Sequence, residues 1–181
     1  MTKQKEILYL LTIAVLIGAC AQLYYSHRWL PAHTIAVYYN HDHKLNEEVT
    51  AAIRDADKFV YFAIYTFTRQ DIADALLGAK HRGLTVIGIT DRDQYNQIEQ
   101  QRKIIDSLRE AGIPVYQQDH SGIMHMKALV TDKTYLSGSY NWTASATNVN
   151  DEVLEVGHDT GLRVRFQSIL EELFKQYGTA P

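Results

Sequence analysis

Residues 125–139 read HMKALVTDKTYLSGS, a pattern of two short strands joined by a tight turn. Side chains of a strand alternate between its two faces, so His125 and Lys127 are predicted to share one face while Met126 points to the other. Asp132 lies at the predicted turn. A histidine and a lysine on one face of an otherwise apolar hairpin predict a functional site at one end of the strand.

Short apolar strands alternate with amphipathic helices on the N-terminal side of this hairpin. Strands are predicted at 34–39, 58–67, 84–90 and 113–118, and helices at 45–56, 69–83 and 93–112. After the hairpin, a strand at 151–157 precedes a final helix at 161–178. Strands that alternate with helices form a sheet covered on both faces. We therefore predict an α/β fold with a mixed, mainly parallel central sheet and helices on both faces.

The composition fits one domain of ordinary size. The 181 residues are 46% hydrophobic, and 18 basic residues are mixed with 21 acidic ones to give a net charge of -3. This balance excludes the overall basic field of strong nonspecific nucleic-acid binders, so any phosphate site must be local. A single cysteine excludes an intrachain disulfide and a multi-cysteine zinc site.

The N-terminal segment is apolar from residue 7 to residue 25 and follows two lysines. Its length is close to the roughly 20 residues that a helix needs to cross a bilayer. One interpretation is a retained apolar anchor helix. The other is a bacterial lipoprotein signal, because LIGAC resembles a lipoprotein cleavage box with Cys20 as the lipid-bearing residue. We predict residues 1–32 as the anchor or signal segment, residues 33–181 as the folded domain, and a location at the periplasmic side of a bacterial cell envelope.

Further polar residues follow the return strand of the hairpin. Ser139 and Asn141 share a face by the strand period of two. Taken singly, His125 fits a partly buried strand histidine, Asp132 a turn residue and Asn141 a helix cap. Together, an imidazole, an amine, a hydroxyl and an amide at strand ends indicate an anion-binding nucleophilic site.

Two other groups of polar residues have side chains that can bind ligands. Asp91 and Arg92 follow a predicted strand end, where α/β proteins place ligands, so they are candidates for the rim of the site. The run HDH at 41–43 has metal-ligand residue types, but adjacent side chains diverge and no matching cluster is evident. A solvated turn is the favoured interpretation of that run.

The sequence HMKALVTD followed by GSYNWTASATNVNDE resembles the HxKxxxxD, GSxN and Glu motif of the phospholipase D superfamily. The stretch AIYTFTRQDIADALLGAKHRGLTV also resembles the strand, turn and helix of its small single-motif members. Those members are the bacterial Nuc-type endonucleases and the mitochondrial cardiolipin hydrolase group. The similarity spans roughly residues 34–177. The spacing departs at one point, because five residues separate Asp132 from Gly138 where the motif has six.

The resemblance implies a phospholipase D-like phosphodiesterase that uses no metal and no cofactor. His125 is the implied nucleophile, which attacks phosphorus and forms a phosphohistidine. Lys127 and Asn141 are implied to hold the nonbridging phosphate oxygens, with Ser139 assisting.

The resemblance also implies roles for two carboxylates and a second chain. Glu152 is expected to accept the other imidazole N–H of the nucleophile. For Asp132, a catalytic role and a hairpin-orienting role stay equally open. The reaction needs a second histidine as proton donor, and the chain has one HxK motif, so the resemblance implies a homodimer in which His125 of each protomer faces the other.

Two enzymatic functions and one binding function follow from these residues. We favour an endonuclease that hydrolyses nucleic-acid phosphodiester bonds. The alternative is a phospholipase D-type hydrolase of membrane phospholipid such as cardiolipin, which the apolar N-terminal segment makes credible. A noncatalytic dimer that binds polyanions is the third hypothesis. It is the weakest, because binding needs positive charge but not an oriented imidazole.

Overall fold

The structure is a computed structural model that describes residues 5, 12–20, 22 and 35–178. The chain divides into one unit of residues 1–34 and another of residues 35–181. In the first unit residues 12–20 are helical, and the rest of the predicted apolar segment, apart from residue 22, lies outside the described residues. Within the described residues, no helix has both the length and the apolar character needed to cross a membrane.

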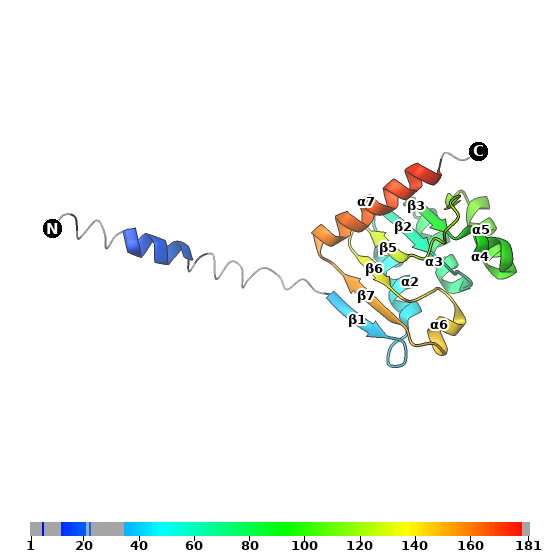
Figure 1. Cartoon of the computed structure of the whole chain (residues 1–181), viewed down its shortest axis with the longest axis horizontal. Helices are drawn as coiled ribbons and strands as arrows, with labels where there is room; N and C mark the ends of the chain where they lie inside the picture. The colour runs from blue at the N-terminus through cyan, green and yellow to red at the C-terminus, as the bar shows by residue number, and fades with distance from the viewer. Residues whose placement is uncertain (1–4, 6–11, 21, 23–34, 179–181) are drawn as a thin grey trace. The chain divides into compact units, whose positions relative to one another are not determined.

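Seven strands of the second unit form one mixed sheet in the order β1-β7-β6-β5-β2-β3-β4 among the residues described (Figure 1). β2, β3 and β4 are parallel, and the pairs β2–β5, β5–β6, β6–β7 and β1–β7 are antiparallel. The bounds are β1 (Ile35–Tyr39), β2 (Phe59–Ile64), β3 (Thr85–Thr90), β4 (Val115–Gln117), β5 (Lys127–Thr131), β6 (Tyr135–Gly138) and β7 (Val153–Gly157).

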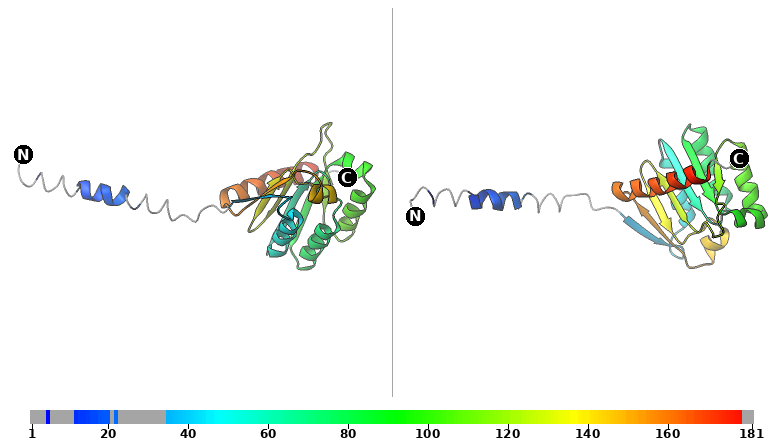
Figure 2. Two further views of the ribbon diagram at one scale, coloured as in Figure 1. Left: turned by 90° about the horizontal axis from the view of Figure 1, so that it is seen from below. Right: turned by 45° about the horizontal axis from the view of Figure 1, so that its top comes forward.

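Helices cover both faces of this sheet, as Figure 2 shows. Helices α2, α3 and α5 pack on one face, and α7 crosses the other. Two short helices, α4 and α6, lie in the connections. The bounds are α2 (Leu45–Asp55), α3 (Gln70–His81), α4 (Arg92–Gln97), α5 (Glu99–Glu110), α6 (Ala144–Asn148) and α7 (Thr160–Tyr177).

The apolar residues of the strands divide between two core clusters by the period of two. Phe62 and Leu129 belong to the cluster beneath α2 and α3, whereas Ala63 and Val130 belong to the cluster beneath α7. Met126 also packs against the α7 cluster. This arrangement confirms the predicted alternation in the HMKALVT strand.

The predicted mixed α/β sheet with helices on both faces is confirmed, and three details differ. Antiparallel pairs outnumber parallel ones, because β5, β6 and β7, the strands after residue 125, all pair antiparallel with their neighbours. The helix predicted at 93–112 is broken at Ile98, whose extended backbone ends α4 and begins α5. Ile98 is β-branched, which lowers its helix propensity. His125 lies just before β5 rather than within it.

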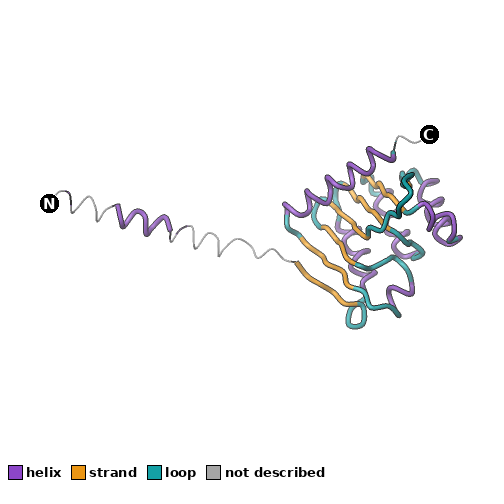
Figure 3. The backbone as a smooth tube through the Cα atoms, in the orientation of Figure 1, coloured by secondary structure: helices purple, strands orange, loops and turns teal. Residues whose placement is uncertain are grey.

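Several strands begin or finish at one end of the sheet, which is called here the site edge. The end of β2 meets the start of β5, since Ile64 pairs with Lys127. The end of β6 meets the start of β7, since Gly138 pairs with Leu154. Figure 3 shows the loops that connect the strands to one another and to the helices. Segments that are far apart in sequence therefore present their side chains together.

Candidate active site

His125 and Lys127 come together with Tyr65, the residue that follows β2. The ring of Tyr65 makes an edge-on contact with the imidazole of His125, with 4.7 Å between the ring centroids. The Lys127 ammonium lies 4.9 Å from the centroid of the same ring and donates a hydrogen bond of 2.9 Å to the carbonyl oxygen of His125. The His125 side chain is exposed, so it is accessible to a substrate.

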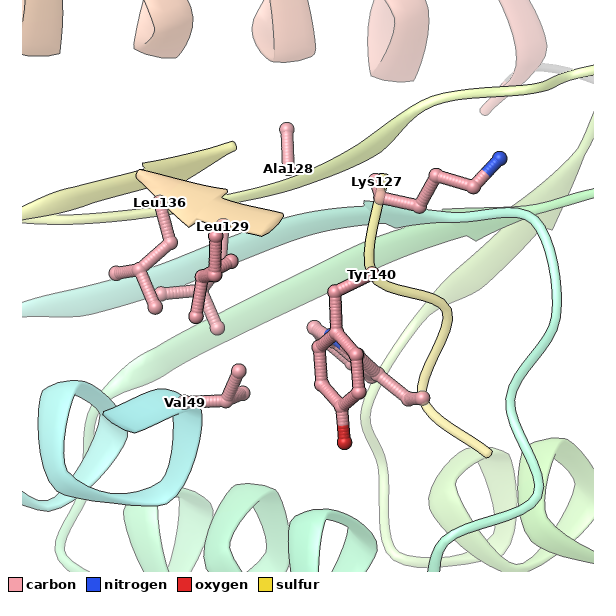
Figure 4. Close-up of a pocket in the computed structure, with 8 residues that line it drawn as sticks. Val49, Lys127, Ala128, Leu129, Leu136 and Tyr140 are labelled. Carbon is pink, nitrogen blue, oxygen red and sulfur yellow. The ribbon is translucent and has the colours of Figure 1, made fainter. Parts of the chain in front are cut away.

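Lys127 is the buried cation of the site, with 8% of its surface exposed. Burial lowers the pKa of its ammonium, and the nearby charge of Glu152 opposes that shift. Its stem lines a cavity of about 10 Å³ with Val49 and Leu129, and Figure 4 shows the nitrogen extending away from those apolar side chains. The cavity has room for about one water molecule. The cavity is therefore too small to hold a substrate.

Glu152 precedes β7 and is 7% exposed. Its carboxylate accepts a hydrogen bond of 2.5 Å from the Ser139 hydroxyl and one of 3.1 Å from the Asn150 amide. Its backbone N–H donates to Asn40. Within the described part of the chain, no hydrogen bond joins Glu152 to His125, the partner that the resemblance implies for it. The structure instead brings Glu152 to Ser139 and to the charge of Lys127.

Asn141 is oriented by the loop after β2. Its side-chain oxygen accepts a hydrogen bond of 3.2 Å from the backbone N–H of Thr66. The next residue, Trp142, is anchored by its backbone N–H to the Thr66 carbonyl and by its ring to Phe67, at 4.8 Å. With its oxygen engaged, the Asn141 amide presents its NH₂ group, which is the donor that a phosphate oxygen requires.

Asp132 lies apart from these residues, at the opposite end of β5 from Lys127. Its carboxylate accepts hydrogen bonds from the backbone N–H groups of Asp57 and Lys58 at 3.0 and 3.1 Å. Partial burial would raise the pKa of Asp132, but these backbone donors outweigh it and lower the pKa. The structure therefore places Asp132 against the backbone that leads into β2, and β5 separates it from the other candidate groups.

Asp91 lies in the core of the domain rather than at the predicted rim of the site. It is fully buried and accepts hydrogen bonds from the backbone N–H of Gln94 and Met124 and from the Gln118 amide. Its carboxylate thereby holds the segment that leads into His125. Arg92 lies beside it, half-exposed, 3.5 Å from the Asp93 carboxylate.

Two histidines of the HDH run pair with carboxylates. His43 lies 2.7 Å from a Glu48 oxygen, and His41 lies 3.2 Å from Asp151. Across the residues that the structure describes, no three His, Cys, Asp or Glu side chains are grouped so that they could hold a metal ion.

Sequence reasoning missed Tyr65 and Gln118 as neighbours of the candidate site. The sequence pattern did not indicate Tyr65, because an aromatic residue at the end of an apolar strand is typical of a core position. Gln118 stands in a polar loop, and nothing in its local pattern signals that it binds a buried carboxylate.

Comparisons with known proteins identify the family of the chain. The family model described as "Cardiolipin synthase, PLD-like domain" matches residues 49–177. The chain is 33% identical over 123 residues to the mitochondrial cardiolipin hydrolase of Chlamydomonas reinhardtii, a match of 67% of this chain and 54% of that protein. It also resembles the crystal structure of Nuc from Salmonella typhimurium, a phospholipase D family member, with a TM-score of 0.74 and 27% identity over 80% of this chain and 95% of Nuc. NucT from Helicobacter pylori gives a TM-score of 0.71 at 27% identity, covering 78% of this chain and 96% of NucT.

The chain therefore belongs to the family of PLD-like domains, and the predicted resemblance is confirmed. It spans about half the length of the algal hydrolase that it matches.

Proposed function

We propose that this chain is a phosphodiesterase that works through a phosphohistidine formed on His125. The observation that carries the proposal is the meeting at the site edge of an accessible imidazole, the buried ammonium of Lys127 and the oriented amide of Asn141. An imidazole is the nucleophile, and the two donors suit the oxygens on which charge accumulates during phosphoryl transfer.

The proposed reaction has two steps. In the first, a neutral ring nitrogen of His125 attacks phosphorus, a phosphorus–nitrogen bond forms, and the phosphorus–oxygen bond to the leaving group breaks. A proton donor on the other side of phosphorus protonates the leaving alkoxide. In the second, water attacks phosphorus, gives its proton to that same group, and releases the imidazole. The groups that take part are an imidazole, an ammonium and an amide, so the reaction is predicted to proceed in the presence of a chelator.

The proton donor is proposed to come from a second copy of the chain. A single imidazole cannot be nucleophile and acid at once, because the two groups act on opposite sides of phosphorus. Among the described residues, no second imidazole is in hydrogen-bond or ring contact with His125. We propose a homodimer whose two His125 side chains meet at a shared site.

Nucleic acid is the favoured substrate. The likeness to Nuc and NucT covers nearly all of those two proteins, whereas the algal hydrolase matches over about half its length. This supports the resemblance to the compact Nuc-type endonucleases. A membrane phospholipid such as cardiolipin is the second candidate, and the identity to a mitochondrial cardiolipin hydrolase favours it.

One panel of substrates tests the function. The purified full chain is incubated in EDTA with single-stranded DNA, RNA, duplex DNA and cardiolipin vesicles, beside its His125→Asn variant. Cleavage of nucleic acid by the wild type alone is the expected result. Cleavage of cardiolipin alone would replace the nuclease by the lipase. A His125→Asn variant that keeps more than a few per cent of the activity would contradict the phosphohistidine step.

The apolar segment of residues 7–25 is proposed to hold the domain at a bacterial membrane on the periplasmic side. Its composition and the two preceding lysines support this location. Fractionation of expressing cells should recover the full chain with membranes and a chain lacking residues 1–32 with the soluble fraction. A Cys20→Ala variant that loses membrane association would identify the lipoprotein form, and one that keeps it would identify the anchor helix.

A further inference from the structure

Tyr65 occupies a special place, since one aromatic ring contacts both groups that the proposed function depends on. The imidazole of His125 meets the ring edge-on, with 67° between the two planes. The ammonium of Lys127 lies over the same ring. Both contacts are at distances at which an aromatic ring attracts its neighbour.

The position of Tyr65 is fixed by its backbone. Its N–H donates a hydrogen bond of 3.0 Å to the Met126 carbonyl, and its own carbonyl accepts one of 3.2 Å from the Gln101 amide. Gln101 is fully buried and also binds the Phe67 backbone at 2.9 Å. The Tyr65 hydroxyl makes no hydrogen bond with any described residue. The ring can therefore be changed while the surrounding backbone keeps its anchors.

The Tyr65 ring and the charge of Glu152 both act on the Lys127 ammonium. The ammonium has three N–H donors, and one of them binds the His125 carbonyl. Within the described ranges, no carboxylate forms an ion pair with it. The charged and titratable groups that face it are Glu152, His125 and Tyr65. A ring face attracts the cation without neutralising it, so the positive charge stays available to a phosphate.

We propose that Tyr65 is a positioning residue that holds the His125 imidazole and the Lys127 ammonium in the arrangement needed for attack on a phosphate. This inference rests on the proposed phosphodiesterase function. The Tyr65 ring holds the imidazole through the edge-on contact and holds the ammonium over its own face. Without the ring, the side chains of His125 and Lys127 are still present but can rotate away from this arrangement. Small misplacements of reacting groups lower the rate by large factors.

Kinetics of four variants test the role of the ring. Tyr65→Phe keeps the ring and is expected to stay within about twofold of the wild-type kcat. Tyr65→Leu and Tyr65→Met remove the ring and are expected to lower kcat about tenfold or more, together with a rise in KM. Tyr61→Leu is the matched control, because Tyr61 lies in β2, the strand that Tyr65 follows, and contacts Phe174 of α7 instead. Its kcat should stay at the wild-type level.

Titration of the full chain with inorganic phosphate gives a readout that does not need turnover. Imidazole proton resonances, assigned with His125→Asn, should shift on phosphate binding in the wild type and in Tyr65→Phe. The ring-free variants should bind phosphate about tenfold more weakly, because Lys127 is no longer held. Two ring-free variants are used so that poor folding of one leaves the other to decide.

The outcomes separate the positioning role from the proposed function. Weaker phosphate binding by the ring-free variants supports the positioning role, whether or not the wild type cleaves a substrate. If the wild type cleaves none of the substrates, the proposed function is wrong and the positioning role still stands. Ring-free variants with wild-type kcat and wild-type phosphate affinity would overturn the inference. A Tyr65→Phe variant as impaired as Tyr65→Leu would overturn it as well, since the hydroxyl would then be the acting group.

Discussion

The ammonium of Lys127 donates a hydrogen bond of 2.9 Å to the carbonyl oxygen of His125, so the cation proposed to bind phosphate is tied to the backbone of the proposed nucleophile. Lys127→Ala should lose about 3 kcal/mol or more of transition-state stabilisation, a fall in kcat of over about a hundredfold. The measurement is kcat and KM on the preferred substrate. A change in KM alone would indicate a binding role instead.

A matched control for Lys127 lies on the same hairpin. Lys133 is half-exposed and lies 3.5 Å from Asp55 and 3.1 Å from Asp57, near the end of β5 that is remote from the site. Lys133→Ala removes the same charge and should leave kcat within about twofold. A similar loss in both variants would mean that net charge, rather than the position of Lys127, controls the rate.

Asp132→Asn should affect stability more than activity. The native carboxylate accepts two backbone N–H groups, so its removal should lower the free energy of unfolding by about 1 kcal/mol at pH 7. Because the folded-state pKa is lowered, the stabilisation is complete above about pH 4, the unfolded value, and is lost as the pH falls through the folded pKa. Denaturant unfolding at pH 7 and pH 3 should show the difference between variant and wild type shrinking. A large loss of kcat at unchanged stability would restore the catalytic role of Asp132.

Asp91→Asn should impair the site from within the core. One oxygen of Asp91 accepts from both Gln118 and Met124, and the other accepts from Gln94. An amide has one acceptor oxygen, so a buried donor loses its partner at a cost of about 1–3 kcal/mol. We expect that loss in denaturant unfolding together with a fall in kcat of about tenfold. Asp93→Asn, at the exposed neighbouring carboxylate, should change neither quantity.

Gly138→Ala should disturb the start of the Ser139 loop. A Cβ atom at Gly138 would lie 2.2 Å from the Val153 carbonyl oxygen, which also accepts the Ser139 backbone N–H. Overpacking of this kind costs about 1–3 kcal/mol. Gly78→Ala is the control, because its Cβ would meet its nearest neighbour at 4.0 Å on a helix. It should be neutral or stabilising in thermal unfolding. A harmless Gly138→Ala would contradict the close strand approach.

Mixing subunits tests the shared site. Wild type and His125→Asn chains are combined in equal amounts and allowed to exchange. Heterodimers would hold one imidazole and should be almost inactive. Random pairing leaves about a quarter of the dimers wild type, so activity should fall toward about half of that of the same wild-type protein unmixed. Exchange without loss of activity, or an active monomer in sedimentation, would contradict the dimer.

The hairpin pattern predicted the most reliable part of the site. Strand alternation correctly separated Met126 from Lys127, and the motif identified the family. Tertiary pairing could not be predicted. The partner of Glu152 is Ser139 because β6 and β7 pair antiparallel, and no local pattern specifies that neighbour. Asp132 belongs to the motif in sequence but is separated from it in space by the length of β5.

The pairing of β1 with β7 also affects when the domain can complete its fold during synthesis. Asn40, just after the first strand of the sheet, binds the backbone of Glu152, just before the last strand. A ribosome releases His125 and Lys127 before it releases the residues that carry this carboxylate. Contacts between such distant positions form late and slow the folding of a domain. A chain still under synthesis therefore carries the proposed nucleophile, His125, before Glu152 is available to complete the proposed site.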